Sequence, residues 1–277
     1  RQRAVARSGT YSISGSLVAD LFFGAHDYLI AAALQSAWGS SKPTITATTI
    51  SAVASDNSYN DSGNGFLAAG FLAGQRITIS GFAGAGVVVN NFADAVITSV
   101  TAGKIIIGGT DGDVIVDDAA GESVTIACAG VQLIVGSTVP TVAILERETD
   151  VAVDTLYRHC RIADLGLAVT LNATVVSTFS VMGETQENYT VPGGATFTAA
   201  TTSGTFIPTI GYMHENNVAQ AHLTEYNLQL TNNMDPRFSL FQRGAYDIGN
   251  GLFTASGSMT AYLPNSTMWD KYVNETN

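Results

Sequence analysis

The side chains that most often carry out chemistry are few in this sequence and lie far apart. The four histidines lack the spacing of a metal site, and no C-x-x-C or H-x-x-x-H pair occurs; they are His26, His159, His214 and His222. The acidic group Asp111, Asp113, Asp117 and Asp118 lacks the D-x-D-x-D-G spacing of a calcium loop. No G-x-S-x-G nucleophile motif is present. The sequence therefore predicts no catalytic centre, no metal site and no cofactor, and favours a protein that is not an enzyme.

The composition predicts an acidic protein built from strands. The chain of 277 residues has 12 Lys and Arg against 23 Asp and Glu, a net charge of −11, and is rich in Gly (28) and poor in Pro (6). Negative charge disfavours binding to a nucleic-acid backbone. Cys128 and Cys160 are too few and too far apart for a disulfide scaffold, so we expect two buried thiols. Arg1 opens without an initiator Met, which suggests an ordered portion of a longer or processed chain.

One strand-like motif occurs near both ends of the chain. Residues 9–21 read GTYSISGSLVADL and residues 251–263 read GLFTASGSMTAYL, so the two align at a constant offset of 242 positions. Ser-Gly-Ser lies at the centre of each copy. The alternation of side chains predicts a strand in both places, and an internal repeat of this kind indicates a pseudo-symmetric architecture. We expect both copies to lie in one sheet system, with the narrow Ser-Gly-Ser backbone at a site of close packing.

Between the two copies the composition changes sharply. After an expected helix at residues 26–38, the stretch 44–130 has two basic and eight acidic residues and is cut into short β-type runs by Gly- and Asp-rich turns. These runs are 44–53, 75–80, 95–100, 104–107, 114–116 and 123–128. This pattern predicts a small Ig-like β-sandwich, inserted at 44–130 into a discontinuous core domain formed by 1–43 and 131–277.

The core domain continues with further strands and two long connections. We expect strands at 141–147, 156–171, 173–182 and 222–231, and a short C-terminal helix after Pro264. The acidic stretch 148–155 and the Gly/Thr-rich stretch 183–206 are expected to be loops, and loops of the second length are usually functional. Residues 232–251 are expected to be turn and connector.

The order of these segments resembles a known family. A strand ending in SGSL, a helix with AAAL, an inserted β domain, the segment TVAILERETDVAVDTLYRHCRIADLGLAVTLNATVVSTFSVMG and a terminal FTASGSMTAYL strand look like the major tail tube proteins of long, flexible-tailed bacteriophages. The resemblance covers 1–43 and 131–277 and is carried by order and spacing. It implies a mainly β fold, a tail-tube-type sandwich or barrel with one flanking helix.

The resemblance also implies a structural function. Such subunits form hexameric rings, which stack into a tube on a tape-measure protein and surround a channel through which double-stranded DNA passes without specific binding. Tail terminator and baseplate or tip proteins are the further partners, the virion tail is the location, and assembly takes place in the host cytoplasm. Two alternatives stay open. One is another ring protein, such as a terminator; the other is a carbohydrate- or cell-surface-binding module that uses aromatic residues of the insert, namely Tyr59, Phe66, Phe71, Phe82 and Phe92.

Two sets of residues are candidates for roles in such a tube. An acidic wall would repel DNA phosphates and leave the duplex hydrated, and the candidates for lumen-facing charge are Asp20, Asp164 and Glu225; an outward-facing, solvated position is the alternative. The two long connections could reach an adjacent ring. Their candidate residues are Glu148, Asp150, Asp154, Glu187, Tyr189 and Phe197.

Overall fold

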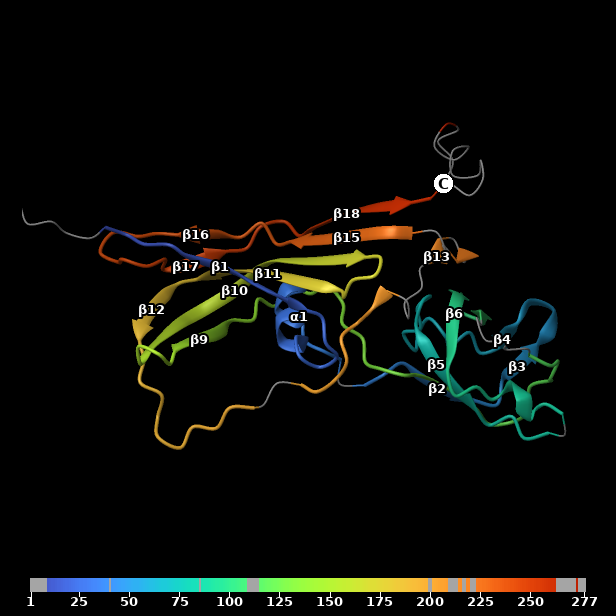
Figure 1. Ribbon diagram of the computed structural model, residues 1–277. Coiled ribbons are helices and arrows are strands. Elements are labelled where there is room, and N and C mark those ends of the chain that lie inside the picture. Colours follow the sequence, from blue (N-terminus) through green and yellow to red (C-terminus); the bar gives the residue numbers. More distant parts are fainter. Residues whose placement is uncertain are drawn as a thin grey trace, which may run out of the picture. The chain divides into compact units, whose positions relative to one another are not determined.

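The computed structural model describes residues 9–39, 41–84, 86–108, 115–198, 201–208, 214–215, 218–219, 223–262 and 273. The chain divides into two compact units. The first unit comprises Arg1–Ala37, Ile134–Met213 and Gln220–Asn277, and the second unit comprises Trp38–Leu133 and His214–Ala219. Both are built mainly from antiparallel strands (Figure 1), which confirms the mainly β class.

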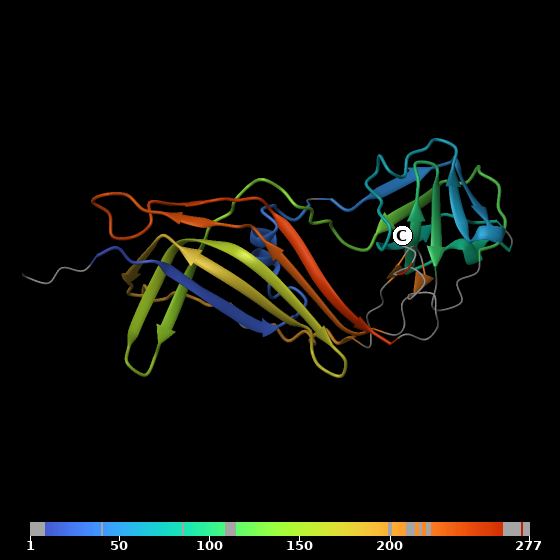
Figure 2. The ribbon, with the colours of Figure 1, turned by 90° about the horizontal axis from the view of Figure 1, so that it is seen from above.

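The described part of the first unit contains the long sheet and the helix α1. Its elements are β1 (Ile13–Asp20), α1 (Asp27–Ala33), β9 (Val142–Glu148), β10 (Val153–Thr170), β11 (Val176–Gly183), β12 (Thr185–Asn188), β15 (Leu223–Thr231), β16 (Asp235–Arg237), β17 (Asp247–Gly249) and β18 (Thr254–Ala261). The main sheet has the order β1-β11-β10-β15-β18, with every neighbouring pair antiparallel. The two copies of the repeated motif are therefore the two edge strands of one sheet (Figure 2).

Strand β10 is long enough to serve two groups of strands. Its first part pairs with β9 on one side and β12 on the other, and its second part pairs with β11 and β15. Two irregularities separate these parts, one between Tyr157 and Cys160 and one between Ile162 and Asp164. His159, within the first of them, has a φ of 50°. Bulges of this kind bend a strand and increase its twist. The bend lets one strand contribute both to the main sheet and to the β9–β10–β12 group.

Helix α1 packs on one face of the main sheet and closes the core of the first unit (Figure 1). The buried cluster there consists of Ala32, Ala33, Cys160, Ile162, Leu165, Phe179 and Val181. The helix ends at Ala33, earlier than the predicted residue 38. Gln35 has a left-handed backbone with φ of 52°, and the Leu34 carbonyl accepts a hydrogen bond from Gly136 N at 2.9 Å. A hydrogen bond to a distant segment of the same chain thus takes the place of a further helical turn.

A buried amide network fastens the end of α1 to the sheet. Asn232 is 1% exposed. Its Nδ2 donates to the carbonyls of Ala33 (2.9 Å) and Ile162 (3.0 Å), while its Oδ1 accepts from Gln35 Nε2 at 2.8 Å. Gln35 also exchanges hydrogen bonds with the side chain of Asn250. Because buried polar groups are costly unless paired, this network fixes where the helix, the β10 bulge and the end of β15 meet.

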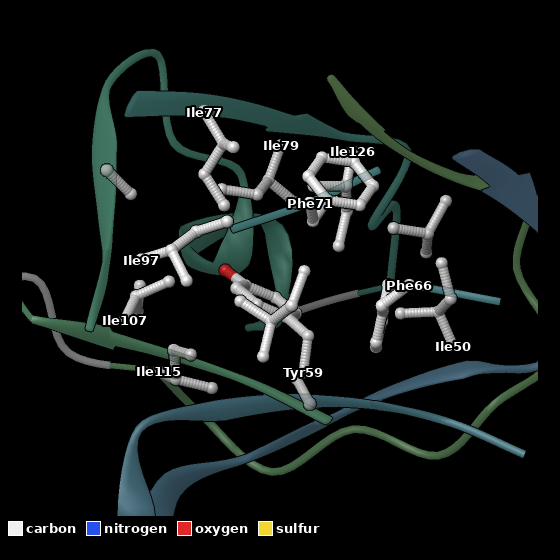
Figure 3. Close-up of a cluster of buried hydrophobic side chains, with 14 of the residues drawn as sticks. Ile50, Tyr59, Phe66, Phe71, Ile77, Ile79, Ile97, Ile107, Ile115 and Ile126 are labelled. Atoms are coloured by element: carbon white, nitrogen blue, oxygen red, sulfur yellow. The ribbon is translucent and has the colours of Figure 1, made fainter. Parts of the chain in front are cut away.

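The second unit is a seven-stranded antiparallel structure with its own core. Its strands are β2 (Thr44–Ala47), β3 (Ile50–Val53), β4 (Ser58–Asp61), β5 (Arg76–Ser80), β6 (Ala95–Val100), β7 (Lys104–Gly108) and β8 (Val124–Cys128), with short 3-10 helices η1 (Ala54–Asp56) and η2 (Val88–Asn90), and the two-stranded pair β13 (His214–Glu215) and β14 (Val218–Ala219). Alternate residues of the longer strands face inward, as in the buried pattern of β5. Figure 3 shows the resulting cluster of isoleucine and aromatic side chains.

The strand order of the second unit differs from the predicted Ig-like arrangement. The described strands follow the path β2-β8-β5-β6-β7-β4-β3, whereas an Ig fold pairs its first, second, fifth and fourth strands in one sheet and its third, sixth and seventh in the other. Here the first strand pairs with the seventh and the fifth with the sixth. Short β runs predict a small β unit but carry no information about which run pairs with which.

Several other predicted elements need correction. The run 44–53 is two strands joined by a turn, and 58–61 is the strand β4. The predicted loop 148–155 is only the short turn between β9 and β10, since β10 begins at Val153. The predicted loop 183–206 begins with β12, and the connector 232–251 contains β16 and β17. Residues 115–116 form no strand. The predicted C-terminal helix falls on residues outside those described, apart from Val273.

Candidate assembly interface and channel face

The two edge strands of the main sheet are long and exposed. β1 and β18 have eight residues each, and neither has a fully buried residue. Val18 and Met259 are 62% and 61% exposed. The only charged residue in either strand is Asp20, at the last position of β1. Natural proteins usually protect such edges with charge, proline or a covering segment, because an open edge is a template for pairing with another chain.

The repeat gives the two edges the same surface. Ser14 and Ser16 correspond to Ser256 and Ser258, and all four lie on the same face of the sheet, since antiparallel partners share a face. Gly15 has no atom within 4 Å of the position that a Cβ would occupy. The sheet has five strands that alternate in direction, so β1 and β18 run parallel to each other at opposite edges.

The face of the sheet turned away from α1 carries a uniform set of small and polar side chains. We call it the polar face, and the strand registers assign it Ser14, Ser16, Val18, Asp20, Arg161, Asp164, Gly166, Ala168, Thr170, Val176, Thr178, Ser180, Met182, Glu225, Asn227, Gln229, Thr231, Thr254, Ser256, Ser258 and Thr260. The one basic residue among them is Arg161, whose guanidinium pairs with Asp247 at 2.9 Å and donates to the Ile248 carbonyl within the subunit. A shallow hollow opens at its centre, where Gly166, Ala168 and Thr178 leave room.

The three lumen candidates all belong to the polar face. Asp20 lies at the end of β1, where its Oδ1 accepts a hydrogen bond from Thr174 Oγ1 at 2.8 Å. Asp164 follows the β10 bulge, which reverses the side-chain alternation and turns this carboxylate away from the core. Glu225 is exposed in β15 and accepts a hydrogen bond from Asn227 Nδ2 at 2.9 Å. The structure thus places on one face of the sheet three acidic residues that lie far apart in the sequence. That they face a channel stays a prediction.

The inter-ring candidates gather around β9, β10 and β12. Glu148 ends β9, Asp154 lies in β10 and Glu187 in β12, with Asp150 in the turn between β9 and β10. They are partly engaged within the chain: Arg147 forms ion pairs with Asp154 at 3.1 Å, and Arg158 with Glu187 at 2.5 Å. Both members of the Arg158–Glu187 pair are exposed, and exposed ion pairs contribute little to stability.

The segment after β12 returns along its own unit. Tyr189 N donates to Asp154 O at 2.9 Å, and the Arg147 guanidinium carbon lies 5.1 Å from the centre of the exposed Phe197 ring. Phe22 and Thr205 then form a β-bridge beyond the end of β1. Contacts to an adjacent ring by Tyr189 and Phe197 therefore stay a prediction, and the single chain already holds both residues in place.

The described histidines and aspartates that could have formed a metal site make contacts within the fold instead. The His26 ring lies 5.7 Å from that of Phe179, and His159 Nδ1 lies 3.1 Å from Glu184 Oε2; His214 lies in β13, while His222, Asp111 and Asp113 fall outside the described residues. Asp117 Oδ1 accepts from Ala54 N, and Asp118 pairs through its backbone with Ala52. Within the described part of the chain, no three His, Cys, Asp or Glu residues are placed to hold a metal ion.

The two cysteines are buried and unlinked, which confirms the sequence-based expectation. Burial raises the pKa of both thiols above the ordinary value of a cysteine. A raised pKa keeps them protonated and unreactive.

The aromatic residues of the insert belong to its core. Tyr59, Phe66 and Phe71 are completely buried (Figure 3). Phe82 is 2% exposed, and the partly buried Phe92 packs against the same cluster. The Tyr59 hydroxyl donates to the Asn90 carbonyl at 2.7 Å. These rings cannot stack on a sugar at the surface, so the proposed carbohydrate-binding role for them is wrong.

Asp61 is a buried carboxylate with a structural role in the second unit. It accepts hydrogen bonds from Thr49 Oγ1 (2.5 Å) and from the backbone N–H groups of Gly63 (2.9 Å) and Gly65 (2.8 Å). Burial opposes its ionisation, but these three donors outweigh burial and hold the pKa of Asp61 below its ordinary value. The aspartate therefore stabilises the loop after β4 in its ionised form.

These features define a β-sheet protein whose two uncovered, matching edges suit association with copies of itself. The family model for phage tail tube protein matches residues 1–277. The chain therefore belongs to the phage tail tube protein family, and it is a structural subunit of the tube in the virion tail that assembles with copies of itself. No curated protein matches the sequence. In the part of the chain that the structure describes, no helix is both long and apolar enough to cross a membrane.

Proposed function

We propose that this subunit closes hexameric rings through the edges of its main sheet, in the tube of a long, flexible-tailed phage. The observation that carries this proposal is the pair of exposed edges with the same Ser-Gly-Ser surface. When all subunits of a ring point the same way, β18 of one subunit meets β1 of the next. Because these strands run parallel, the seam between subunits is a parallel strand pair.

The size of such a ring suits a channel. Six five-stranded sheets with strands about 4.8 Å apart close a barrel about 45 Å across before strand tilt widens it and side chains narrow it. One face of each sheet must then line the inside. The α1 side is occupied by the helix and its core, so the polar face is the one that can face the lumen.

The polar face suits DNA that must move without binding. Its acidic residues Asp20, Asp164 and Glu225 repel phosphate, and its Ser, Thr, Asn and Gln side chains hold water. A basic residue would form phosphate contacts and release counterions, which is how proteins bind DNA tightly. The one basic residue that the registers place on this face, Arg161, is largely buried and lies beside Asp247 and Glu184, which offset its charge within the subunit. We infer that the double-stranded DNA passes over this surface with its hydration shell intact.

The other expected roles belong to the same proposal. The β9–β10 turn and the segment after β12, with Glu148, Asp150, Asp154, Glu187, Tyr189 and Phe197, contact the adjacent ring. A tape-measure protein occupies the lumen during assembly in the host cytoplasm, and terminator and baseplate or tip proteins bind the tube ends. Residues 44–130 form an inserted domain outside the lumen. A structural role of this kind involves no enzymatic reaction.

Electron microscopy of the purified chain tests this proposal. We expect rings with a central channel, and stacked tubes at higher concentration. Particles that stay monomeric at every protein and salt concentration examined would contradict it. The carboxylates are tested separately, by labelling Asp164→Cys tubes with a maleimide too large to enter the channel. Slow labelling is expected in tubes and fast labelling in dissociated subunits; equal rates would place Asp164 outside the lumen.

A further inference from the structure

The connection between β16 and β17 presents apolar side chains to solvent. We call residues 238–246, FSLFQRGAY, the tip segment. Phe241 is 103% exposed and Leu240 is 82% exposed, with Tyr246 at 51% and Phe238 at 44%. Isolated exposed apolar residues are common, but a contiguous group of this kind marks an interaction surface.

The tip segment is firmly held at its base. Tyr246 N donates to Arg237 O at 2.9 Å, and Tyr11 N donates to Arg243 O at 2.8 Å. Asp247 accepts from Arg161 Nη2 at 2.9 Å, and Ile248 is completely buried. These contacts keep the tip segment in one position relative to the sheet.

Close packing also fixes the path of the tip segment. A Cβ at Gly244 would overlap the Glu184 carbonyl oxygen, so only glycine fits there. A surface held in place in this way loses little conformational freedom when it binds.

The opposite end of the sheet carries a second group of exposed apolar residues. β1, β10 and β18 run in the same direction, so the residues that follow them lie at one end of the sheet. These are Phe23, which is 75% exposed, Leu171 at 51% and Tyr262 at 70%. We call them the rim. The tip segment lies at the other end, between the end of β15 and the start of β18.

We propose that the tip segment of one copy of this chain docks on the rim of a second copy in the next ring. This inference rests on the proposed ring and adds the contact along the tube axis. Edge strands join subunits side by side, but a tube also needs a head-to-tail contact between two different surfaces, which propagates without closing. The tip segment and the rim are two such surfaces, at opposite ends of the same strands. The tip segment is also bonded to the chain next to the lateral edge, because Tyr11, which donates to the Arg243 carbonyl, lies two residues before the start of β1.

A paired set of variants tests this contact. The tip variant carries Leu240→Asp and Phe241→Asp, and the rim variant carries Phe23→Asp and Tyr262→Asp. The control carries Leu67→Asp and Leu72→Asp, two residues of the second unit that are 50% and 51% exposed. We expect the tip and rim variants to form rings like those of the unmodified chain, with at least about a tenfold drop in the fraction of protein found in tubes. The control should form tubes normally.

Mixing preassembled rings of the two variants gives a sharper result. A tip-variant ring keeps its rim, and a rim-variant ring keeps its tip segments, so one good contact remains between them. The mixture should therefore give stacks of two rings and nothing longer, measured by mass photometry and electron microscopy. Normal tubes from either variant alone, or no two-ring stacks in the mixture, would overturn the inference. Loss of rings in the tip variant alone would also overturn it, whereas an unmodified chain without rings would overturn the proposed ring itself.

Discussion

Replacing Ser16 with proline should block the seam between subunits while leaving the subunit folded. Leu21 N donates to Val175 O at 2.7 Å, one step beyond the last pair of the β1–β11 register. In an antiparallel ladder, residues that bond to the partner alternate with residues whose N–H and C=O point away. Leu17 therefore bonds to β11, while the N–H of Ser16 points out of the sheet, where proline is tolerated.

The expected loss can be worked from this geometry. Ser14, Ser16, Val18 and Asp20 direct four N–H and four C=O groups toward a neighbouring subunit. Removing one donor forfeits a net of about 1 kcal/mol and leaves a carbonyl of the neighbour unpaired at about 1–3 kcal/mol, so each seam weakens by about 2–4 kcal/mol. A change of 2 kcal/mol is roughly a 30-fold change in affinity. Closure of a ring multiplies this loss over all its seams.

The assay is the critical concentration for assembly, measured by sedimentation and checked by microscopy. Ser16→Ala keeps the backbone donor and should assemble like the unmodified chain. Leu17→Pro removes a bond within the subunit and should unfold part of the sheet, which circular dichroism detects. If Ser16→Pro is folded and assembles at the same concentration as Ser16→Ala, then β1 is not at the seam and the reasoning is wrong.

Three further predictions concern the amide network, the polar face and the second unit. Asn232→Ala leaves the carbonyls of Ala33 and Ile162 unpaired and should destabilise the first unit by about 3–5 kcal/mol, which calorimetry detects as a lower transition temperature. As a control, replacing the partly exposed Asn227 with Ala should change the transition temperature little. Equal effects of the two substitutions would contradict a stabilising role of the network. The double variant Asp164→Lys, Glu225→Lys should slow DNA passage through otherwise normal tubes, measured as the rate of DNA ejection from assembled phage. The uncharged control is the double variant Asp164→Asn, Glu225→Gln. An unchanged ejection rate would speak against the polar face as the channel wall. Because the pKa of Asp61 is lowered in the folded chain, the stability that its carboxylate contributes is fully present above the pKa of the unfolded chain and is lost as pH falls through the folded pKa. Acid should therefore unfold the second unit below about pH 4, and Asp61→Asn should make the stability of that unit less dependent on pH. The same acid sensitivity in Asp61→Asn would refute the assignment.

The sequence predicts the strands of the main sheet better than their partners. Alternation of side-chain types identifies β11 and β15 closely, and in β11 every second residue is also buried. The repeat identifies β1 and β18 as equivalent strands, but only the registers show that they occupy opposite edges. Pairing depends on contacts between separate segments of the chain, as between Ser16 of β1 and Ser180 of β11, and a local pattern does not show them.

The missed elements have specific physical causes. β12, β16 and β17 are only three or four residues long, too short for a periodic pattern. The end of α1 was misplaced because the apolar spacing of Ile30, Leu34 and Trp38 favours a longer helix, whereas buried hydrogen bonds of Gln35 hold the backbone in another conformation. The acidity of Asp20, Asp164 and Glu225 was readable from the sequence. That a bulge places Asp164 on the same face as the other two was not.

A density map of the assembled tube, at a resolution that separates strands, tests the central claim most directly. We predict that β18 of each subunit pairs in parallel with β1 of its neighbour, and that Asp20, Asp164 and Glu225 line the channel. Subunit contacts that leave both edge strands unpaired, or a polar face directed to the outside of the tube, would contradict this account.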